Sequence, residues 1–152
     1  HVVDSGGKYV ASACYGCDPA MAEGSDEDRA WVEENAPVLS SGGHCRTPGE
    51  VREEFWRAWS YPRARGAFLA AECAWPVEAR FLAACVDDDP EGRAKTGPYP
   101  LVDISSVRLA AGVDPLETCA RRPEELPLHD PLADARQSAR LLLEALSSLK
   151  RR

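Results

Sequence analysis

Residues 67–86 have the sequence AFLAAECAWPVEARFLAACV. The compact apolar run at 67–71 is suited to a buried β-strand, and Pro76 then fits the first turn of a helix. Apolar residues follow at helical spacing, namely Val77, Phe81, Leu82 and Val86. A strand that leads directly into a helix is typical of an α/β domain.

A second helix is predicted shortly before this segment, beginning after Thr47. Thr47 fits the N-cap, Pro48 the first helical position and Glu50 the third, which together make a capping box. The residues expected on the buried face of this helix recur every four positions: Val51, Phe55 and Trp59.

Two short β-prone runs surround a glycine-rich turn in residues 1–14, which predicts a β-hairpin. The turn has the sequence DSGG at 4–7. Ser25 and the acids that follow it predict the start of a helix that contains Trp31 and Val32.

The carboxyl-terminal part of the chain continues the alternation of strand and helix. Residues 87–100 have the composition of a long exposed loop, and 101–104, Leu-Val-Asp-Ile, are predicted to form a second buried strand. A short helix at 105–111 and a proline-rich loop at 122–131 precede a long final helix. The apolar seam expected along it consists of Leu132, Ala135, Ala139, Leu142 and Leu146, with Leu143 and Leu149 beside them. This order predicts a single α/β domain with a mixed sheet over residues 1–152.

The composition bounds the class of protein. The chain has 152 residues, with 18 Lys and Arg against 25 Asp and Glu, and a formal net charge of −7. No apolar run approaches the roughly 18 residues of a membrane span, and no signal-peptide pattern opens the chain, so we expect a soluble protein without a membrane partner. The acidic balance argues against binding nucleic acid through bulk charge, but not against a substrate held through metal ions.

The chain contains six cysteines, at positions 14, 17, 45, 73, 85 and 119. Cys73 and Cys85 lie in mostly apolar runs, where free cysteine behaves as a small core residue. We therefore expect a reducing compartment and a cytoplasmic protein. A structural zinc site is an alternative role for four residues of the amino-terminal part: Cys14, Cys17, His44 and Cys45. Their spacing lacks the two regular pairs that are typical of zinc sites.

Two groups of residues could perform chemistry. His129 stands five residues before Asp134 at the predicted start of the final helix, with Asp130 as N-cap, so both side chains can face one cleft. Glu72 ends the first buried strand and Glu78 lies in the first turn of the next helix, where carboxylates are well placed to hold Mg²⁺ or Mn²⁺. The alternatives are a loop histidine with a solvated helical acid, and a Glu78 that only complements the helix dipole.

Three features occur in a fixed order along the chain. They are an acid-bearing helix with Phe81-Leu82, a Leu-Val-Asp-Ile strand after a long loop, and His129-Asp130-x-Leu132-x-Asp134-Ala135-Arg136 at the final helix. In this order the chain resembles the DEDDh family of 3′-to-5′ exonucleases, which have the RNase H-like fold. Within that family it is most similar in appearance to the bacterial exoribonucleases of the polyadenylate-trimming type.

The resemblance implies a two-metal site, in which four acids bind two Mg²⁺ or Mn²⁺ ions and a histidine is the general base. It assigns His129 as the base, Asp134 as the last metal-binding acid and Glu78 to the place of the second-motif aspartate. Asp103 matches an aspartate that has no clear catalytic role. The implied partner is the 3′ end of a single-stranded nucleic acid, with RNA favoured over DNA by resemblance alone. The oligomeric state stays open, with a homodimer as one alternative.

The chain departs from the family in two places. Glu78 has one methylene more than the usual aspartate, which changes how it reaches a metal ion. The first motif, an Asp-x-Glu on the central strand, is absent, since Asp4-Ser5-Gly6 has no glutamate. Either the chain begins after its own central strand, or residues 1–4 are the first strand and the site is degenerate. The alternative function is therefore a non-catalytic member that binds nucleic acid or a protein partner.

Overall fold

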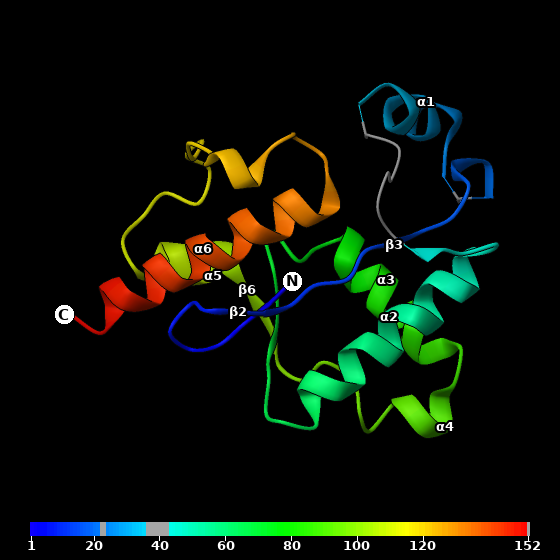
Figure 1. The fold of residues 1–152 in the computed structure, drawn as a ribbon, viewed down its shortest axis with the longest axis horizontal. Helices are drawn as coiled ribbons and strands as arrows, with labels where there is room; N and C mark the ends of the chain where they lie inside the picture. The colour runs from blue at the N-terminus through cyan, green and yellow to red at the C-terminus, as the bar shows by residue number, and fades with distance from the viewer. Residues whose placement is uncertain (22–23, 36–42, 152) are drawn as a thin grey trace.

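The computed structural model describes residues 1–21, 24–35 and 43–151. The strands are β1 (Val2–Val3), β2 (Tyr9–Ala11), β3 (Tyr15–Gly16), β4 (Gly43–His44), β5 (Leu69–Ala71) and β6 (Leu101–Asp103). The helices are α1 (Asp26–Asn35), α2 (Pro48–Arg63), α3 (Val77–Asp87), α4 (Pro90–Arg93), α5 (Ile104–Ala110) and α6 (Pro131–Leu149), with short 3-10 helices η1 (Pro19–Met21) and η2 (Pro123–Glu125). Figure 1 shows α5 and α6 together on one side of β6, and α2, α3 and α4 together on the other.

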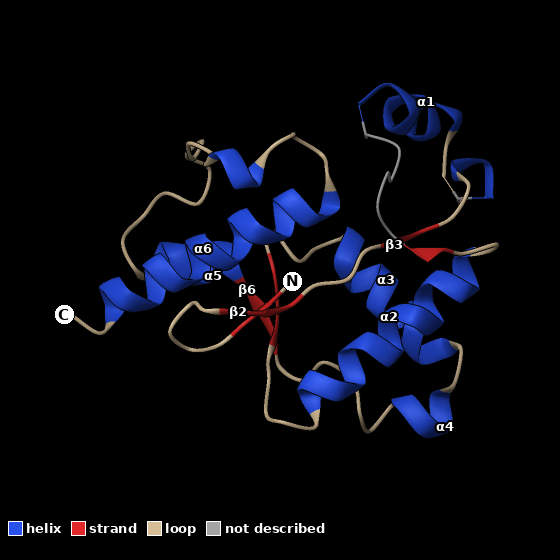
Figure 2. Ribbon diagram, viewed as in Figure 1, coloured by secondary structure: helices blue, strands red, loops and turns tan. Residues whose placement is uncertain are grey.

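The described strands form three separate two-stranded sheets, which Figure 2 shows as short segments among the helices. β1 and β2 are antiparallel, whereas β3 with β4 and β5 with β6 are parallel. The α/β class is confirmed, but the described residues do not form the single mixed sheet that was predicted. The strands pair over only two or three residues, and Leu69 of β5 packs against helical side chains. The runs at 67–71 and 101–104 were predicted to be buried strands, but the residues of β5 and β6 are only half buried and Phe68 is 70% exposed.

The predicted hairpin in residues 1–14 is confirmed by the β1–β2 pair. The Oδ1 atom of Asp4 accepts hydrogen bonds from the backbone N–H groups of Gly6 and Lys8, both at 2.9 Å. Gly7 has a φ of +84°, a conformation that glycine adopts without steric cost. The Asp4 side chain thus stabilises the turn, and Gly7 adopts the required positive φ without steric strain.

The predicted helix starts at residues 25 and 47 are also confirmed. In α2, Thr47 Oγ1 accepts a hydrogen bond from the Glu50 N–H at 3.2 Å. In a standard capping box the Glu50 carboxylate would accept from the N–H of the N-cap, Thr47. Here it accepts from the N–H of Arg46, one residue earlier, at 2.7 Å. In α1, Ser25 and Asp28 cap each other reciprocally, each accepting the other's backbone N–H at 3.1 Å. None of the α1 residues is buried, and Trp31 is half exposed.

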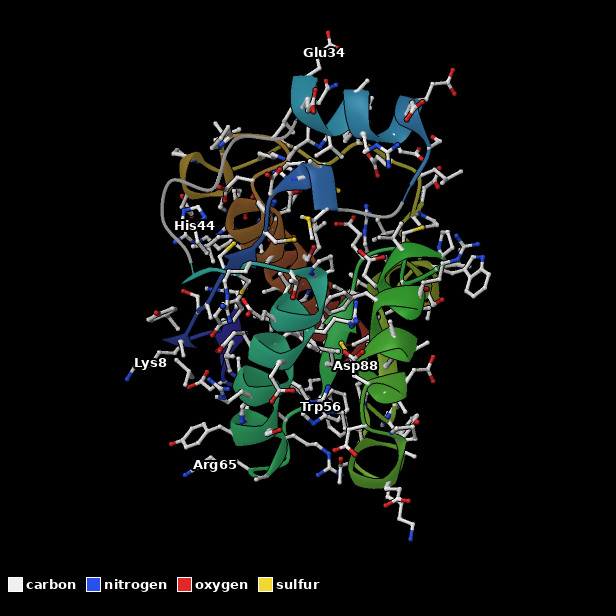
Figure 3. All side chains as sticks on the ribbon, turned by 90° about the vertical axis from the view of Figure 1, so that its right-hand side faces the viewer. Lys8, Glu34, His44, Trp56, Arg65 and Asp88 are labelled. Atoms are coloured by element: carbon white, nitrogen blue, oxygen red, sulfur yellow. The ribbon has the colours of Figure 1, made fainter. Side chains whose placement is uncertain are left out.

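The core between α2 and α3 is centred on Trp56, Trp59 and Cys85, and Figure 3 shows Trp56 between the two helices. Of the predicted stripe, Trp59 is buried, while Val51 and Phe55 are only half buried. Trp56 was not predicted because it lies one position off the four-residue repeat. Since α2 packs against α3, and Leu69 of β5 also contacts the cluster of Trp56, Trp59 and Cys85, its buried face is broader than a single stripe.

The prediction that residues 87–100 form a long exposed loop is wrong. The segment contains the helix α4 and the buried Arg93. Arg93 Nη1 donates to the backbone oxygen of Cys85 at 2.9 Å, and Nη2 donates to the Glu53 carboxylate. The guanidinium also lies 5.1 Å from the ring centre of Trp56. One buried arginine therefore ties the segment to α2 and α3.

The final helix begins as predicted, but its buried face differs from the predicted seam. The buried residues of α6 are Ala133, Gln137, Leu141 and Ala145. Leu142 is half buried, and Leu146 is exposed. Two polar side chains fix the rotation of the helix about its axis. Gln137 Nε2 donates to the Cys119 oxygen at 3.4 Å, and Arg140 binds Glu125. The buried face of α6 is therefore shifted by about one residue from the predicted leucine seam.

Candidate active site

The carboxyl ends of β5 and β6 lie at the same edge of their parallel pair. Ala71 of β5 is opposite Asp103 of β6, and Glu72 follows Ala71 directly. Because both strands run in the same direction, the sequence places Glu72 and Asp103 side by side at this edge. In α/β proteins this is the edge where ligands are commonly bound.

Asp103 is committed to holding three elements together. Its Oδ2 atom caps α5 by accepting from the Ser106 N–H at 3.0 Å and from the Ser106 hydroxyl. Its Oδ1 atom accepts from the Ala74 N–H at 3.2 Å, which fixes the connection between β5 and α3. The Ser106 hydrogen bond, supported by the backbone of Ala74, holds the pKa of Asp103 below its ordinary value. The carboxylate is thus a structural junction at the edge of the sheet.

Glu72 connects the same edge to the two carboxyl-terminal helices. Its Oε2 atom accepts from the Ser138 hydroxyl of α6 at 3.2 Å. Its Oε1 atom lies 3.9 Å from Nη1 of Arg108, a buried arginine of α5. α6 is therefore anchored beside the carboxyl end of β5.

The start of α6 has the local geometry that its sequence predicts. Asp130 Oδ1 accepts from the N–H groups of Leu132 at 3.0 Å and Ala133 at 2.8 Å, as an N-cap does. His129 lies just outside the helix, with a φ of +62°, and its exposed ring meets the Trp31 ring edge-on at 5.0 Å between centroids. The histidine thus joins the start of α6 to α1.

Asp134 is paired with an arginine rather than standing open. Arg121 Nη1 donates to Asp134 Oδ1 at 2.7 Å and to the Glu125 backbone oxygen at 2.9 Å. This clamp fixes the segment before η2 onto α6. Within the described residues, the Asp134 oxygen nearest Arg121 is therefore already used.

Glu78 lies in the first turn of α3 and is half buried. In the described part of the chain, its carboxylate has no hydrogen bond or ion pair. This position is compatible with the helix-dipole role and leaves both oxygens available to a ligand.

A divalent metal ion fits the chemistry of Glu78 and Asp134, because hard cations prefer carboxylate oxygens. Across residues 1–21, 24–35 and 43–151, however, no group of three or more His, Cys, Asp or Glu side chains is close enough to hold an ion. The residues described do not by themselves complete an ion site. Glu78 and Asp134 as metal ligands stay a prediction.

The register of β3 and β4 explains why the candidate zinc ligands do not converge. Gly16 is opposite His44, and alternate residues of a strand point to opposite faces of the sheet. Cys17 and Cys45 therefore belong to one face of the β3–β4 ribbon, and Cys14 and His44 to the other. Four ligands divided in this way cannot surround one ion.

A cavity of about 510 Å³ lies between α5, α6 and residues 113–120. The buried Arg108 lines it, and its guanidinium is occupied by Cys119 Sγ at 2.9 Å and by the Asp114 and Pro115 backbone oxygens, both at 3.3 Å. Arg140 and Glu144 line it too, and they are paired with each other. Arg108 therefore holds the 113–120 segment in place.

The pair of buried Glu125 and half-buried Arg140 was not predicted from the sequence. The two residues are fifteen positions apart and belong to η2 and α6, so no helical spacing relates them. A glutamate in a proline-rich segment also predicts exposure rather than burial. Only the tertiary arrangement reveals the pair.

Comparison of the chain with known protein families, with curated proteins and with solved structures found no match. No described helix combines the length and the apolar character needed to cross a bilayer. A functional assignment therefore rests on the residues described above.

Proposed function

We propose that the protein is a metal-dependent 3′-to-5′ exonuclease, which hydrolyses phosphodiester bonds at the 3′ end of single-stranded RNA or DNA. The observation that carries the proposal is the position of α6 beside the β5 edge, through the bond from Ser138 to Glu72. Asp134 lies four residues before Ser138 and so shares its side of the helix. This relation supports a site in which Asp134 faces the carboxyl end of the parallel pair.

The proposal includes an RNase H-like arrangement of the strands. In it, the antiparallel β1–β2 pair and the parallel β5–β6 pair are the two sides of one sheet, joined by a central strand with the Asp-x-Glu motif. Among the described strands, β1 pairs only with β2 and β5 only with β6, which leaves each with an edge where another strand can bind. These free edges support the arrangement.

His129 is the proposed general base. A neutral imidazole nitrogen accepts the proton of the attacking water, whose oxygen bonds to phosphorus as the bond to the leaving oxygen breaks. Histidine suits this task because its neutral imidazole has one ring nitrogen free to accept a proton. Exposure at the start of α6 leaves the ring accessible, and the contact with Trp31 limits its orientations.

Mg²⁺ or Mn²⁺ is the proposed cofactor, with Glu78 and Asp134 as two of its oxygen ligands. Such an ion would supply charge neutralisation at the phosphodiester and a more acidic bound water. Binding of the ion at Oδ1 of Asp134 would also displace Arg121.

The test uses the chain together with any residues that precede His1 in its gene. The protein is incubated with 5′-labelled RNA and DNA oligonucleotides and Mn²⁺, and the shortening of each is followed on a gel. We expect His129→Ala to slow shortening by about 10²–10⁴-fold. His44→Ala, which removes an exposed histidine on β4, is the matched control and should leave the rate unchanged. Equal rates for the parent and His129→Ala would refute the proposed mechanism.

The second candidate is a non-catalytic module that binds single-stranded nucleic acid. It is favoured by the Arg121–Asp134 pair, which occupies one oxygen of an acid proposed for catalysis. Trp75 and Tyr99, which are 72% and 70% exposed, offer rings on which bases can stack. Oligonucleotide binding that is weakened by Trp75→Ala, in a protein without metal-dependent degradation, would favour this candidate.

A further inference from the structure

Cys17 and Cys45 directly follow the last paired residues of the β3–β4 ribbon. The register pairs Tyr15 with Gly43 and Gly16 with His44, so the next step pairs Cys17 with Cys45. The Cys45 N–H donates to the Gly16 oxygen at 2.8 Å, which holds the backbone of Cys45 against the end of β3, and Cys17 contributes to the raised pKa of Cys45. Two thiols distant in the sequence are thus brought to one place.

The two cysteines also share a face of the ribbon. A Cβ atom at Gly43 would come within 2.9 Å of Cδ1 of Tyr15, which shows that the side chains at these opposite positions point the same way. Cys17 and Cys45 each lie one residue beyond the strand end and two residues after Tyr15 and Gly43, and side chains two apart along extended backbone share a face. Cys14 is excluded from the pair because it belongs to the other face.

The spacing of neighbouring strands suits a disulfide. Adjacent strands lie about 4.7–4.9 Å apart, within the roughly 4.4–6.8 Å between Cα atoms that disulfides span. Both thiols are free and only partly buried, so a small disulfide reagent can reach them. Burial, the nearby Glu50 and Glu54 carboxylates and Cys17 raise the pKa of Cys45, which slows exchange at neutral pH without preventing it.

We propose that Cys17 and Cys45 form a reversible disulfide by exchange with a low-molecular-weight disulfide such as oxidised glutathione. One protein thiolate attacks a glutathione sulfur, which forms a mixed disulfide and releases one glutathione thiolate. The second protein thiolate then attacks the protein sulfur of the mixed disulfide and releases the other glutathione. The protein dithiol loses two electrons, one glutathione disulfide gains them, and the two glutathione thiolates take up the two protons.

The disulfide acts as a redox-controlled link between the two ends of the segment that contains α1. It is independent of the exonuclease proposal, since neither cysteine belongs to the candidate active site. Cys85 is excluded as a competitor because it is fully buried in α3. Cys73 is exposed after β5, outside the ribbon.

The experiment treats the folded protein with oxidised glutathione, blocks remaining thiols with iodoacetamide and digests it with chymotrypsin without reduction. Cleavage after Tyr15 separates Cys14 from Cys17, so mass spectrometry identifies each partner. We expect a peptide pair linked through Cys17 and Cys45, which disappears on reduction. The same treatment in urea, where the ribbon is unfolded, should lower the yield of this pair at least several-fold.

Two variants complete the test. Cys45→Ser should leave Cys17 as a stable mixed disulfide with glutathione, whereas Cys14→Ser should retain the Cys17–Cys45 link. Glutathione on both Cys17 and Cys45 of the parent protein, or a link from either to Cys14, would overturn the proposal. An equal yield of the link in the folded and the urea-treated protein would overturn it too, because the ribbon would then have no part in the pairing.

Discussion

Arg140 holds the buried carboxylate of Glu125 through two parallel hydrogen bonds. Nε of Arg140 donates to Oε1 at 2.6 Å, and Nη2 donates to Oε2 at 2.8 Å. Glu125 is only 2% exposed, and the Arg122 N–H also donates to its Oε2 at 3.0 Å. This pair fastens the segment before α6 onto the helix, and it makes the stability of the protein depend on one buried charge.

Acid should weaken the protein through Glu125. The hydrogen bond from Arg140 lowers the pKa of Glu125 from 4.5 to about 2 in the folded state. As the pH falls from about 6 towards 2, the unfolded chain takes up a proton that the folded protein does not, so stability falls with pH. The difference between the two pKa values corresponds to about 3 kcal/mol. Urea unfolding at a series of pH values measures this loss.

Replacing Glu125 by glutamine tests the same ion pair with Arg140. The substitution should destabilise the protein at neutral pH by more than the loss expected from acid. Glu125→Gln leaves Arg140 with only the longer carboxylate contact to Glu144, at 3.3 Å, and should lower the free energy of unfolding at pH 7 by about 3–5 kcal/mol. The difference in the free energy of unfolding between parent and variant should be smaller by about 2 kcal/mol at pH 3. At this pH the parent has lost much of the stability that the Glu125 carboxylate contributes. Glu124→Gln, at the exposed neighbouring position, is the control. A gap that does not change with pH would contradict the assignment.

The pair between α2 and α3 should contribute less, because it is more exposed. Arg52 Nε and Nη2 donate to the Asp88 carboxylate at 2.6 and 2.9 Å, and Figure 3 shows Asp88 directed toward α2. A double-mutant cycle with Arg52→Ala and Asp88→Ala should give a coupling energy of about 1 kcal/mol, which decreases in high salt. Asp87→Asn serves as a control at an exposed neighbour. Coupling that persists unchanged in 1 M salt would mean that the contribution is not electrostatic.

Asp103 should be required for stability in its role as a cap. Asp103→Ala removes the acceptor for Ser106 and Ala74 and should cost about 1–2 kcal/mol in the free energy of unfolding. Asp103→Asn keeps oxygen acceptor capacity at the N-cap and should cost clearly less. Thermal unfolding of the two variants compares them directly. Equal destabilisation would show that the negative charge matters more than the cap.

Arg121 provides a test of whether Asp134 is a metal ligand. If an ion must displace Arg121, then Arg121→Ala should strengthen Mn²⁺ binding, by about fivefold for a pair that is worth about 1 kcal/mol. Calorimetry on the protein with any residues that precede His1 measures this affinity. Arg136→Ala, which loses a bond to the Glu124 oxygen instead, should leave it unchanged. Weaker binding in Arg121→Ala would remove Asp134 from the ligand set.

Local signals in the sequence predicted the helix starts and turns well. Thr47 before Pro48, and Asp130 before Pro131, place caps whose partners lie within three residues, so the sequence contains the whole interaction. The Asp4 turn is equally local. The exact bounds shift by one residue, as where the predicted strand at 101–104 ends at Asp103 and Ile104 begins α5.

Long-range contacts account for the errors. The leucine seam of the final helix was predicted from the spacing of apolar residues. The buried face is instead set by polar contacts, of Gln137 with Cys119 and of Arg140 with Glu125, which the apolar spacing does not reveal. The candidate site shows the same limit. The sequence correctly placed His129 outside the helix and Asp134 inside it, but could not show that Arg121 pairs with Asp134 across thirteen residues.

The absence of buried residues in α1 has a consequence for its local opening. A helix without buried side chains gains little from tertiary packing, so α1 should separate from the rest at a small fraction of the global unfolding free energy. Its amide hydrogens should exchange with solvent much faster than those of α2 and α6. Because the ring of Trp31 is the neighbour of His129, the candidate base rests against the helix that opens most readily, and each opening changes its surroundings.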